Sequence, residues 1–226
     1  MRIQLPSGTP AELALPVAAG RQHPARGVVL APDIMGLRPL FEQLCARLAA
    51  DHNWAMCAPE PFPGHEHLTI EERQAAVADL DDERQVGDLV AGADVLRERS
   101  GCAKVAALGF CMGGMYVLKA AGTGRFDRAV AFYGMIRVPE AWKGSGHAEP
   151  LDLLRQPHAS PVLAIIGERD VFTPPADVDA LDALPNVITV RYPGAEHGFV
   201  HDPDRPAHRP DDAADAWRRA ITFLKA

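Results

Sequence analysis

The sequence contains only four cysteines among its 226 residues, and no two of them form a C-x-x-C pair. They stand at positions Cys45, Cys57, Cys102 and Cys111, without the spacing of zinc ligands. The cysteines therefore give no indication of a zinc site, and we expect reduced thiols. Three of them are interpreted as small buried hydrophobic residues, whereas Cys111 lies in a distinctive local sequence.

Basic clusters and long apolar runs are also missing. Lysine and arginine number 23 against 30 acidic residues, and no patch of interleaved arginines and aromatics appears, so no nucleic-acid partner is expected. The longest uncharged run, Val105–Leu118, is shorter than the roughly 20 residues of a membrane-spanning helix, and the first ten residues do not resemble a signal peptide. We expect a cytoplasmic protein without membrane association, as a monomer or small homo-oligomer.

Short apolar segments alternate with longer helix-like ones along the whole chain. Nearly continuous apolar runs are typical of strands covered on both faces, so the pattern predicts one domain, residues 1–226, with a doubly wound, mostly parallel α/β sheet. The strands expected in the parallel part are Gly27–Ala31, Trp54–Ala58, Lys104–Phe110, Arg128–Tyr133, Pro161–Ile166 and Val187–Tyr192. Edge strands are expected at Arg2–Leu5 and Leu13–Pro16.

The helix-like segments are amphipathic and cover both faces of the expected sheet. One of them, Ile70–Arg99, is long, and we expect it to break near Gly87. The others are Pro39–Ala50, Gly113–Ala121, Pro174–Ala183 and Asp211–Lys225. Pro-, Gly- and His-rich stretches such as Trp142–Pro150 are expected to be loops.

The most specific motif is GFCMGG at Gly109–Gly114, between an expected strand and an expected helix. It has the G-x-S-x-G pattern of a nucleophile elbow with cysteine in the central position. A sharp strand-to-helix turn needs neighbouring glycines, and it presents the central side chain at a helix N-terminus, which favours a thiolate. The motif predicts that Cys111 is a nucleophile; a core cysteine beside a close glycine contact is the alternative.

A cysteine nucleophile needs a base and a group that orients the base. Asp170 follows the expected strand Pro161–Ile166, and His197 lies between the last expected strand and the C-terminal helix. Taken singly, Asp170 could be a turn residue and His197 a solvated loop residue. The order nucleophile, acid, histidine is the one found in α/β-hydrolases, and it predicts a Cys111/Asp170/His197 triad.

Acyl transfer also needs donors for the developing oxyanion. We expect the backbone N–H of Met112 to be one donor and the N–H of Ile34, after the strand Gly27–Ala31, to be the other. Asp33 lies in the same loop, where it could contact the Cys111 thiol, or else shape the loop.

At this point the sequence resembles the dienelactone hydrolase family. The matching segments run in order along nearly the whole chain: APDIMGL at 31–37, CAPEPFPG at 57–64, VGDL at 86–89, GFCMGG at 109–114, AVAFYG at 129–134, GERDVFTP at 167–174 and AEHGF at 195–199. The resemblance implies an α/β-hydrolase fold with Cys111 as nucleophile, His197 as base and Asp170 orienting it, and it implies no metal or organic cofactor.

The resemblance also implies roles around the nucleophile. In the family's characterised lactonases an acidic residue at the position of Asp33 restrains the resting thiol, but there it is a glutamate, one methylene longer. Two arginines hold the substrate carboxylate in those enzymes; the position four residues after the histidine is His201 here, and Arg73 is the available arginine near the other. His201, Arg73 and Tyr133 are the candidate substrate-binding residues.

The function predicted is hydrolysis of an ester or lactone, a small-molecule substrate, through a thioester on Cys111. Within the same class, a general carboxylesterase or thioesterase remains an alternative. An α/β-hydrolase scaffold that binds a ligand without catalysis is another. A metal-binding protein using His65, Glu66, His67 and later histidines (His201, His208) is the least supported, because no convincing ligand spacing occurs.

Overall fold

The computed structural model describes residues 1–16 and 24–226, which contain one mixed sheet. Its strand order is β1-β2-β4-β3-β5-β6-β7-β8. The β1–β2 and β2–β4 pairs are antiparallel, and all other neighbouring pairs are parallel. The strands are β1 (Arg2–Gln4), β2 (Pro10–Ala14), β3 (Arg26–Ala31), β4 (Trp54–Pro59), β5 (Val105–Phe110), β6 (Ala129–Phe132), β7 (Val162–Gly167) and β8 (Val187–Tyr192). The predicted α/β class is confirmed.

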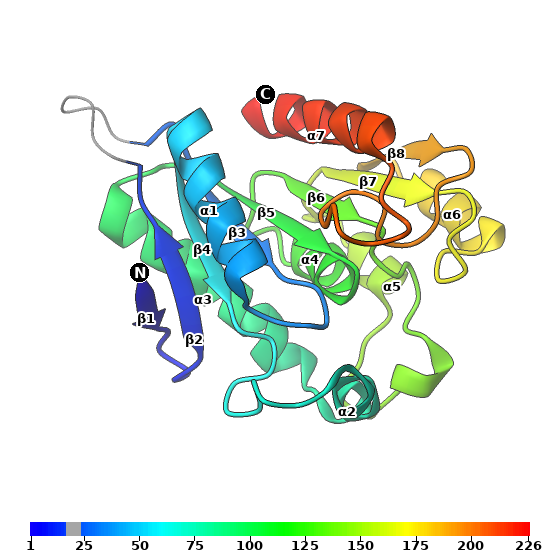
Figure 1. Cartoon of the computed structure of the whole chain (residues 1–226), viewed down its shortest axis with the longest axis horizontal. Helices are drawn as coiled ribbons and strands as arrows, with labels where there is room; N and C mark the ends of the chain where they lie inside the picture. Colours follow the sequence, from blue (N-terminus) through cyan, green and yellow to red (C-terminus); the bar gives the residue numbers. More distant parts are fainter. Residues whose placement is uncertain (17–23) are drawn as a thin grey trace.

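Helices cover both faces of this sheet (Figure 1). Helices α1 and α7 lie on one face, and α3, α4 and α5 lie on the other. The helical segments are α1 (Pro39–His52), α2 (Ile70–Ala76), the 3₁₀ turn η1 (Val77–Asp79), α3 (Asp82–Ser100), α4 (Met112–Ala121), η2 (Glu140–Trp142), α5 (Pro150–Leu154), α6 (Pro175–Asp182) and α7 (Pro210–Lys225). No helix in the described ranges is long and apolar enough to cross a membrane.

The inner strands are buried along their whole length because both faces are covered. Every residue of β3, β4, β5, β6 and β7 is buried, which accounts for their nearly continuous apolar sequences. The exception is Arg26 at the start of β3, which pairs with Asp127. The edge strand β8 is only partly buried, and Ile188 is 57% exposed.

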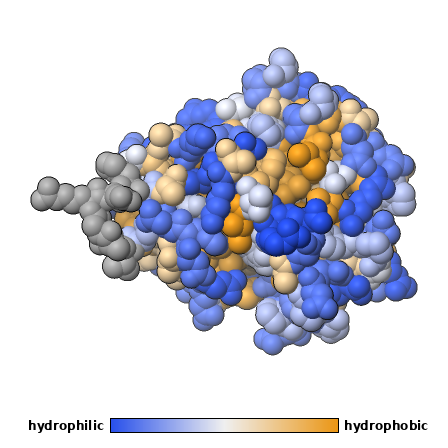
Figure 2. Space-filling model, turned by 90° about the horizontal axis from the view of Figure 1, so that it is seen from above, coloured by the Kyte–Doolittle hydropathy of each residue, from blue (hydrophilic) through white to orange (hydrophobic). Residues whose placement is uncertain are grey.

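Figure 2 shows polar side chains over most of the face seen from above, with apolar ones gathered toward the right of the view.

Three local predictions need correction. The long helical segment breaks at η1, between Ala76 and Asp82, and Gly87 lies inside α3. Asp81 caps the new helix by accepting a hydrogen bond from Glu83 N–H, so the break follows a capping signal rather than a glycine. The second edge strand is Pro10–Ala14 instead of Leu13–Pro16, and the expected loop around Trp142 contains the turn η2.

The parallel strands bring their carboxyl ends to one edge of the sheet. The segment between β8 and α7 folds back across the ends of β5 and β6 (Figure 1). Loops following β3, β5, β6, β7 and β8 therefore meet at this edge, which is where open α/β folds bind ligands.

Candidate active site

Cys111 occupies a strained turn between β5 and α4. Its backbone angles are φ 57° and ψ −122°, one of three positive φ values at non-glycine positions in the described chain. A Cβ at Gly113 would lie 2.2 Å from Pro32 O, and one at Gly109 would lie 2.4 Å from Gly113 O. The glycines of the motif are thus required because the helix start is packed directly on backbone.

The histidine predicted as base is oriented by the predicted acid. His197 Nδ1 lies 2.8 Å from Asp170 Oδ2, and the other oxygen of this buried carboxylate accepts a hydrogen bond from Phe172 N–H at 2.9 Å. The imidazole also packs edge-on against the rings of Phe172 and Tyr133. Its Nε2 has no hydrogen-bond partner among the described residues, and His197 lines the same pocket as Cys111.

Charge on the Cys111 sulfur strongly affects this imidazole. Burial alone would lower the pKa of His197, but the neighbouring Cys111 charge and the hydrogen bond with Asp170 raise it to about 10. His197 is therefore protonated at neutral pH when the thiol beside it is ionised. The two side chains can form a thiolate–imidazolium pair, with the cation held in one orientation by Asp170.

Two backbone N–H groups near the sulfur are without partners. Neither Ile34 N–H nor Met112 N–H donates a hydrogen bond within the described residues. Met112 is the first residue of α4, and Ile34 lines the pocket together with Cys111. These are the two donors that the sequence predicts for an oxyanion hole, and both remain available for a ligand oxygen.

Asp33 is buried, but its carboxylate is fully engaged elsewhere. Oδ1 accepts from Met35 N–H at 2.9 Å and from Arg38 at 2.7 Å, whereas Oδ2 accepts from Arg38 at 3.0 Å and from His201 Nε2 at 2.8 Å. A carboxylate has about four acceptor positions, so none is left for the Cys111 thiol. Of the two roles left open by the sequence, the hydrogen bonds of Asp33 within its own loop favour loop shaping, and no contact with the sulfur is present among the described residues. Thiol regulation by Asp33 stays a prediction.

The three candidate substrate-binding residues do not line the pocket. Tyr133 is fully buried with φ 39°, and its hydroxyl is hydrogen-bonded to His201 Nδ1. The side chain of His201 is itself completely buried. Arg73 is 3% exposed and bonds to Glu66 O, Leu68 O, Ile34 O and Glu60. By donating to Ile34 O, Arg73 supports the loop after β3 that carries Ile34, and it lies outside the pocket in which it was expected.

The pocket over Cys111 has a volume of about 310 Å³ and a mixed lining. Its apolar residues are Ile34, Met35, Ile70, Met135, Trp142 and Phe172. Arg205, which sequence reasoning missed, lines it without any hydrogen bond or ion pair from its guanidinium in the described chain, close above Gly198. Asp202, with a negative charge, also lines the pocket. Arg205 lies in the irregular stretch between β8 and α7, where no periodic pattern indicates which side chains face the pocket.

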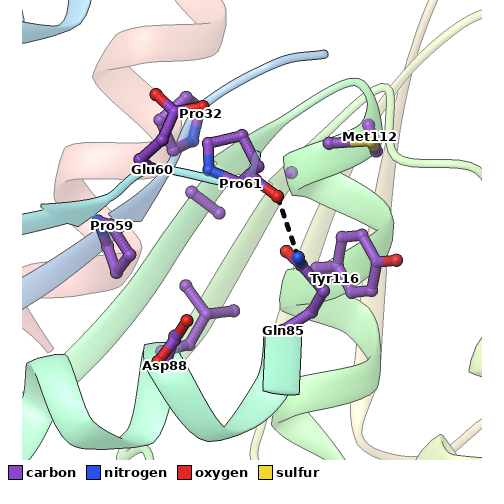
Figure 3. Close-up of a pocket in the computed structure, with 11 residues that line it drawn as sticks. Pro32, Pro59, Glu60, Pro61, Gln85, Asp88, Met112 and Tyr116 are labelled. Atoms are coloured by element: carbon purple, nitrogen blue, oxygen red, sulfur yellow. Dashed lines mark hydrogen bonds between the residues drawn. The ribbon is translucent and has the colours of Figure 1, made fainter. Parts of the chain in front are cut away.

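A second cavity lies behind the elbow (Figure 3). Pro32, Glu60 and Met112 line it, and Gln85 Nε2 closes one side by donating to Pro61 O at 2.9 Å. Its volume of about 20 Å³ holds about one water molecule, so it cannot take an ester. No group of three or more His, Cys, Asp or Glu side chains in residues 1–16 and 24–226 is arranged to hold a metal ion, and both nitrogens of His201 are already engaged.

Comparisons with known proteins identify a family for the whole chain. A model of the "Dienelactone hydrolase family" matches residues 10–226. A Bradyrhizobium protein named "Probable 2-oxo-3-(5-oxofuran-2-ylidene)propanoate lactonase" is 30% identical over 229 residues, covering 95% of this chain and 88% of that protein. The carboxymethylenebutenolidase of Pseudomonas putida is 30% identical over 129 residues, 53% of this chain and 54% of its own length.

A solved structure extends the likeness to three dimensions. A Klebsiella pneumoniae protein whose crystal structure is named for a dienelactone hydrolase has a TM-score of 0.86 and 26% identity, covering 99% of this chain and 97% of that one. The predicted α/β-hydrolase fold is therefore confirmed.

Proposed function

Because this chain belongs to the dienelactone hydrolase family, it is a carboxylic ester hydrolase, and we propose that it cleaves esters or lactones through a Cys111/His197/Asp170 triad. The observation that carries the proposal is the strained turn that holds Cys111 at the start of α4, in one pocket with a His197 already paired to Asp170. A packed structural cysteine would need neither the positive φ nor an oriented imidazole beside it.

The first half of the reaction forms a thioester. The Cys111 thiolate attacks the carbonyl carbon, and the negative charge moves to the carbonyl oxygen, where Ile34 N–H and Met112 N–H can donate to it. Collapse of this intermediate breaks the carbon–oxygen bond. The imidazolium of His197 gives its proton to the departing alkoxide or enolate, so no free alkoxide is released.

Acylation itself prepares His197 for the second half. The largest influence that raises its pKa is the charge on Cys111, and this charge disappears when the sulfur becomes a thioester. The imidazole, neutral after donating its proton, then takes a proton from water while the hydroxide attacks the thioester carbonyl. Collapse releases the carboxylic acid and returns the thiolate, and Asp170 keeps Nε2 of His197 directed toward the reacting groups.

The substrates expected to react best are lactones or esters with stabilised leaving groups. The tetrahedral intermediate can expel either the alkoxide of the substrate or the Cys111 thiolate, and a thiolate is a good leaving group. A poorly stabilised alkoxide would therefore stay attached while the thiolate left, and the substrate would be re-formed. The relative from Bradyrhizobium is named for a lactone that carries a propanoate. In this chain the unpaired guanidinium of Arg205 is the group best able to bind such a carboxylate. The apolar lining formed by residues such as Trp142 and Phe172 suits an unsaturated ring.

The test is trapping of the acyl-enzyme. With p-nitrophenyl acetate, intact-mass spectrometry is expected to detect acetylation on Cys111, and Cys111→Ala is expected to lose turnover and the adduct together. Cys111→Ser distinguishes a sulfur requirement from a hydroxyl-tolerant esterase, and Cys102→Ala serves as a control because this buried cysteine lies outside the pocket. Retained turnover in Cys111→Ala would refute the assigned nucleophile, and an absence of turnover on every ester and lactone tried would favour the binding-only alternative.

A further inference from the structure

A buried polar network joins three loops at the carboxyl edge of the sheet. His201, from the loop that also carries His197, bonds through Nε2 to Asp33 in the loop after β3 and through Nδ1 to the hydroxyl of Tyr133 after β6. Its ring stacks on Phe41 at 5.6 Å and lies 4.9 Å from the ring of Phe110. Of these three side chains only Asp33 lines the pocket over Cys111, and the hydrogen bonds of His201 tie together the loops that form the pocket.

Only one arrangement of protons satisfies the network. Although burial opposes ionisation, hydrogen bonds from His201 and Arg38 lower the pKa of Asp33 to about 2, so this carboxylate only accepts. His201 Nε2 must therefore donate to it. Burial lowers the pKa of His201 and raises that of Tyr133, so Nδ1 of a neutral imidazole accepts from the Tyr133 hydroxyl. Each hydrogen bond then has one defined donor and one defined acceptor, and such a fully satisfied network is rigid.

The network ends at the peptide that carries Ile34 N–H. The side chain of Asp33 holds Met35 N–H, and its backbone oxygen accepts from Gly36 N–H at 2.9 Å. A trans peptide is planar, with its C=O and N–H pointing in opposite directions. Fixing the Asp33 carbonyl toward Gly36 therefore fixes Ile34 N–H away from it, without an internal partner.

We infer that His201 is a positioning residue for the proposed hydrolysis: by holding Asp33, it sets Ile34 N–H as an oxyanion donor before any substrate arrives. The inference rests on the proposed function. It assigns Asp33 to the support of the oxyanion hole instead of restraint of the thiol, since its acceptor positions are all occupied. The donor would then be ready for neutral esters as well as for substrates that carry a carboxylate.

The experiment separates two reactions of Cys111. Alkylation by iodoacetamide needs the thiolate but no oxyanion donor, whereas acylation by p-nitrophenyl acetate needs both. His201→Leu is expected to slow acylation at least about tenfold, a part of the loss caused by removing one oxyanion donor, and to act on kcat more than on KM. Its alkylation rate is expected to remain within about twofold of wild type because the thiol environment is unchanged.

Two further variants complete the design. In His201→Gln the amide N–H can still donate to Asp33, so most of the acylation rate is expected to return. Thr9→Val is the control for general loss of stability: Thr9 donates to the buried carboxylate of Asp88 at 2.6 Å, next to β2 and away from the pocket. It is expected to lower Tm while leaving both rates of the folded protein unchanged.

The outcomes are distinct. Equal slowing of alkylation and acylation in His201→Leu, or no rescue by His201→Gln, would overturn the positioning role. Failure of wild-type Cys111 to become acylated at all would instead refute the proposed function, and the inference with it. A selective loss of acylation, restored by glutamine, supports the inference.

Discussion

At the scale of single residues, charge on one side chain sets the protonation of its neighbour. The pKa of His197 reaches about 10 against the burial that would lower it, because Cys111 and Asp170 both favour the imidazolium. In the proposed mechanism this imidazolium is the partner of the attacking sulfur, and Asp170 holds it in place. The histidine can then act as an acid before it acts as a base.

Removing the sulfur is therefore expected to lower the pKa of His197. In Cys111→Ala the largest raising influence is lost while burial remains, so the imidazole is expected to titrate well below 10. NMR titration of ring-labelled histidine measures the change, with Asp170→Asn as a second variant that removes only the weaker influence. An unchanged pKa in Cys111→Ala would mean that the two side chains do not interact.

Arg205 gives a prediction about substrate charge. Arg205→Gln is expected to raise KM for a carboxylated lactone by about 10- to 100-fold, the value of one charge-assisted hydrogen bond, with little effect on a neutral ester. Steady-state kinetics on both substrates tests this. Arg209→Gln is the matched control, because Arg209 lies in the same loop but pairs with Asp212 and does not line the pocket. Equal effects on both substrates would count against a carboxylate subsite.

At the scale of elements, the position of α4 depends on how closely its first turn approaches neighbouring backbone. Glycine at 113 lets the helix rest against the carbonyls of Ala31 and Pro32, which brings the elbow to the oxyanion loop. This contact explains why the motif is readable in the sequence. Capping by Asp81, the signal that places the start of α3, was equally readable, whereas Gly87 was misleading because a helix tolerates an isolated glycine.

Two glycine substitutions are expected to have opposite effects. Gly113→Ala places Cβ 2.2 Å from Pro32 O, so backbone must move, and a loss of about 1–3 kcal/mol in the free energy of unfolding is expected, together with reduced acylation. Gly87→Ala has open space within α3 and is expected to gain about 0.5–1 kcal/mol. Urea denaturation measures both. Similar destabilisation by the two alanines would contradict the close approach at position 113.

At the scale of the whole molecule, the sheet collects loops from distant parts of the sequence at one edge. Strand patterns predicted the sheet, and the order of Cys111, Asp170 and His197 predicted three residues that the structure brings together at this edge. The network of Asp33, His201 and Tyr133 could not be predicted, because its bonds join residues 168 and 68 positions apart and hydrogen-bonding capacity carries no mark of its partner. Whether a polar residue is buried, and which group it bonds to, becomes known only from the packed structure.

The same network contributes to stability in a pH-dependent way. The folded-state pKa of Asp33, about 2, lies below its ordinary value of 3.8, so ionised Asp33 stabilises the fold above about pH 4, and this stabilisation is lost as pH falls toward 2. Asp33→Asn is expected to cost on the order of 2 kcal/mol at pH 6 and much less at pH 2.5. Urea denaturation across this range checks the trend.

A surface aspartate provides the comparison for that measurement. Asp152 is 68% exposed and pairs with Arg155, so Asp152→Asn is expected to change the free energy of unfolding by less than about 1 kcal/mol at either pH. A pH-independent cost of Asp33→Asn would indicate lost packing instead of lost charge.

The burial of the other cysteines gives the protein a convenient internal standard. Cys45 and Cys57 are fully enclosed, burial raises the pKa of both thiols, and Cys102 is 4% exposed and outside the pocket. One equivalent of a thiol-specific dye should thus saturate the native chain, and four should saturate the denatured one. The ratio of native to denatured labelling is therefore one to four for a fully folded sample and rises as unfolded chains accumulate. It reports the folded fraction without a separate measurement of protein concentration.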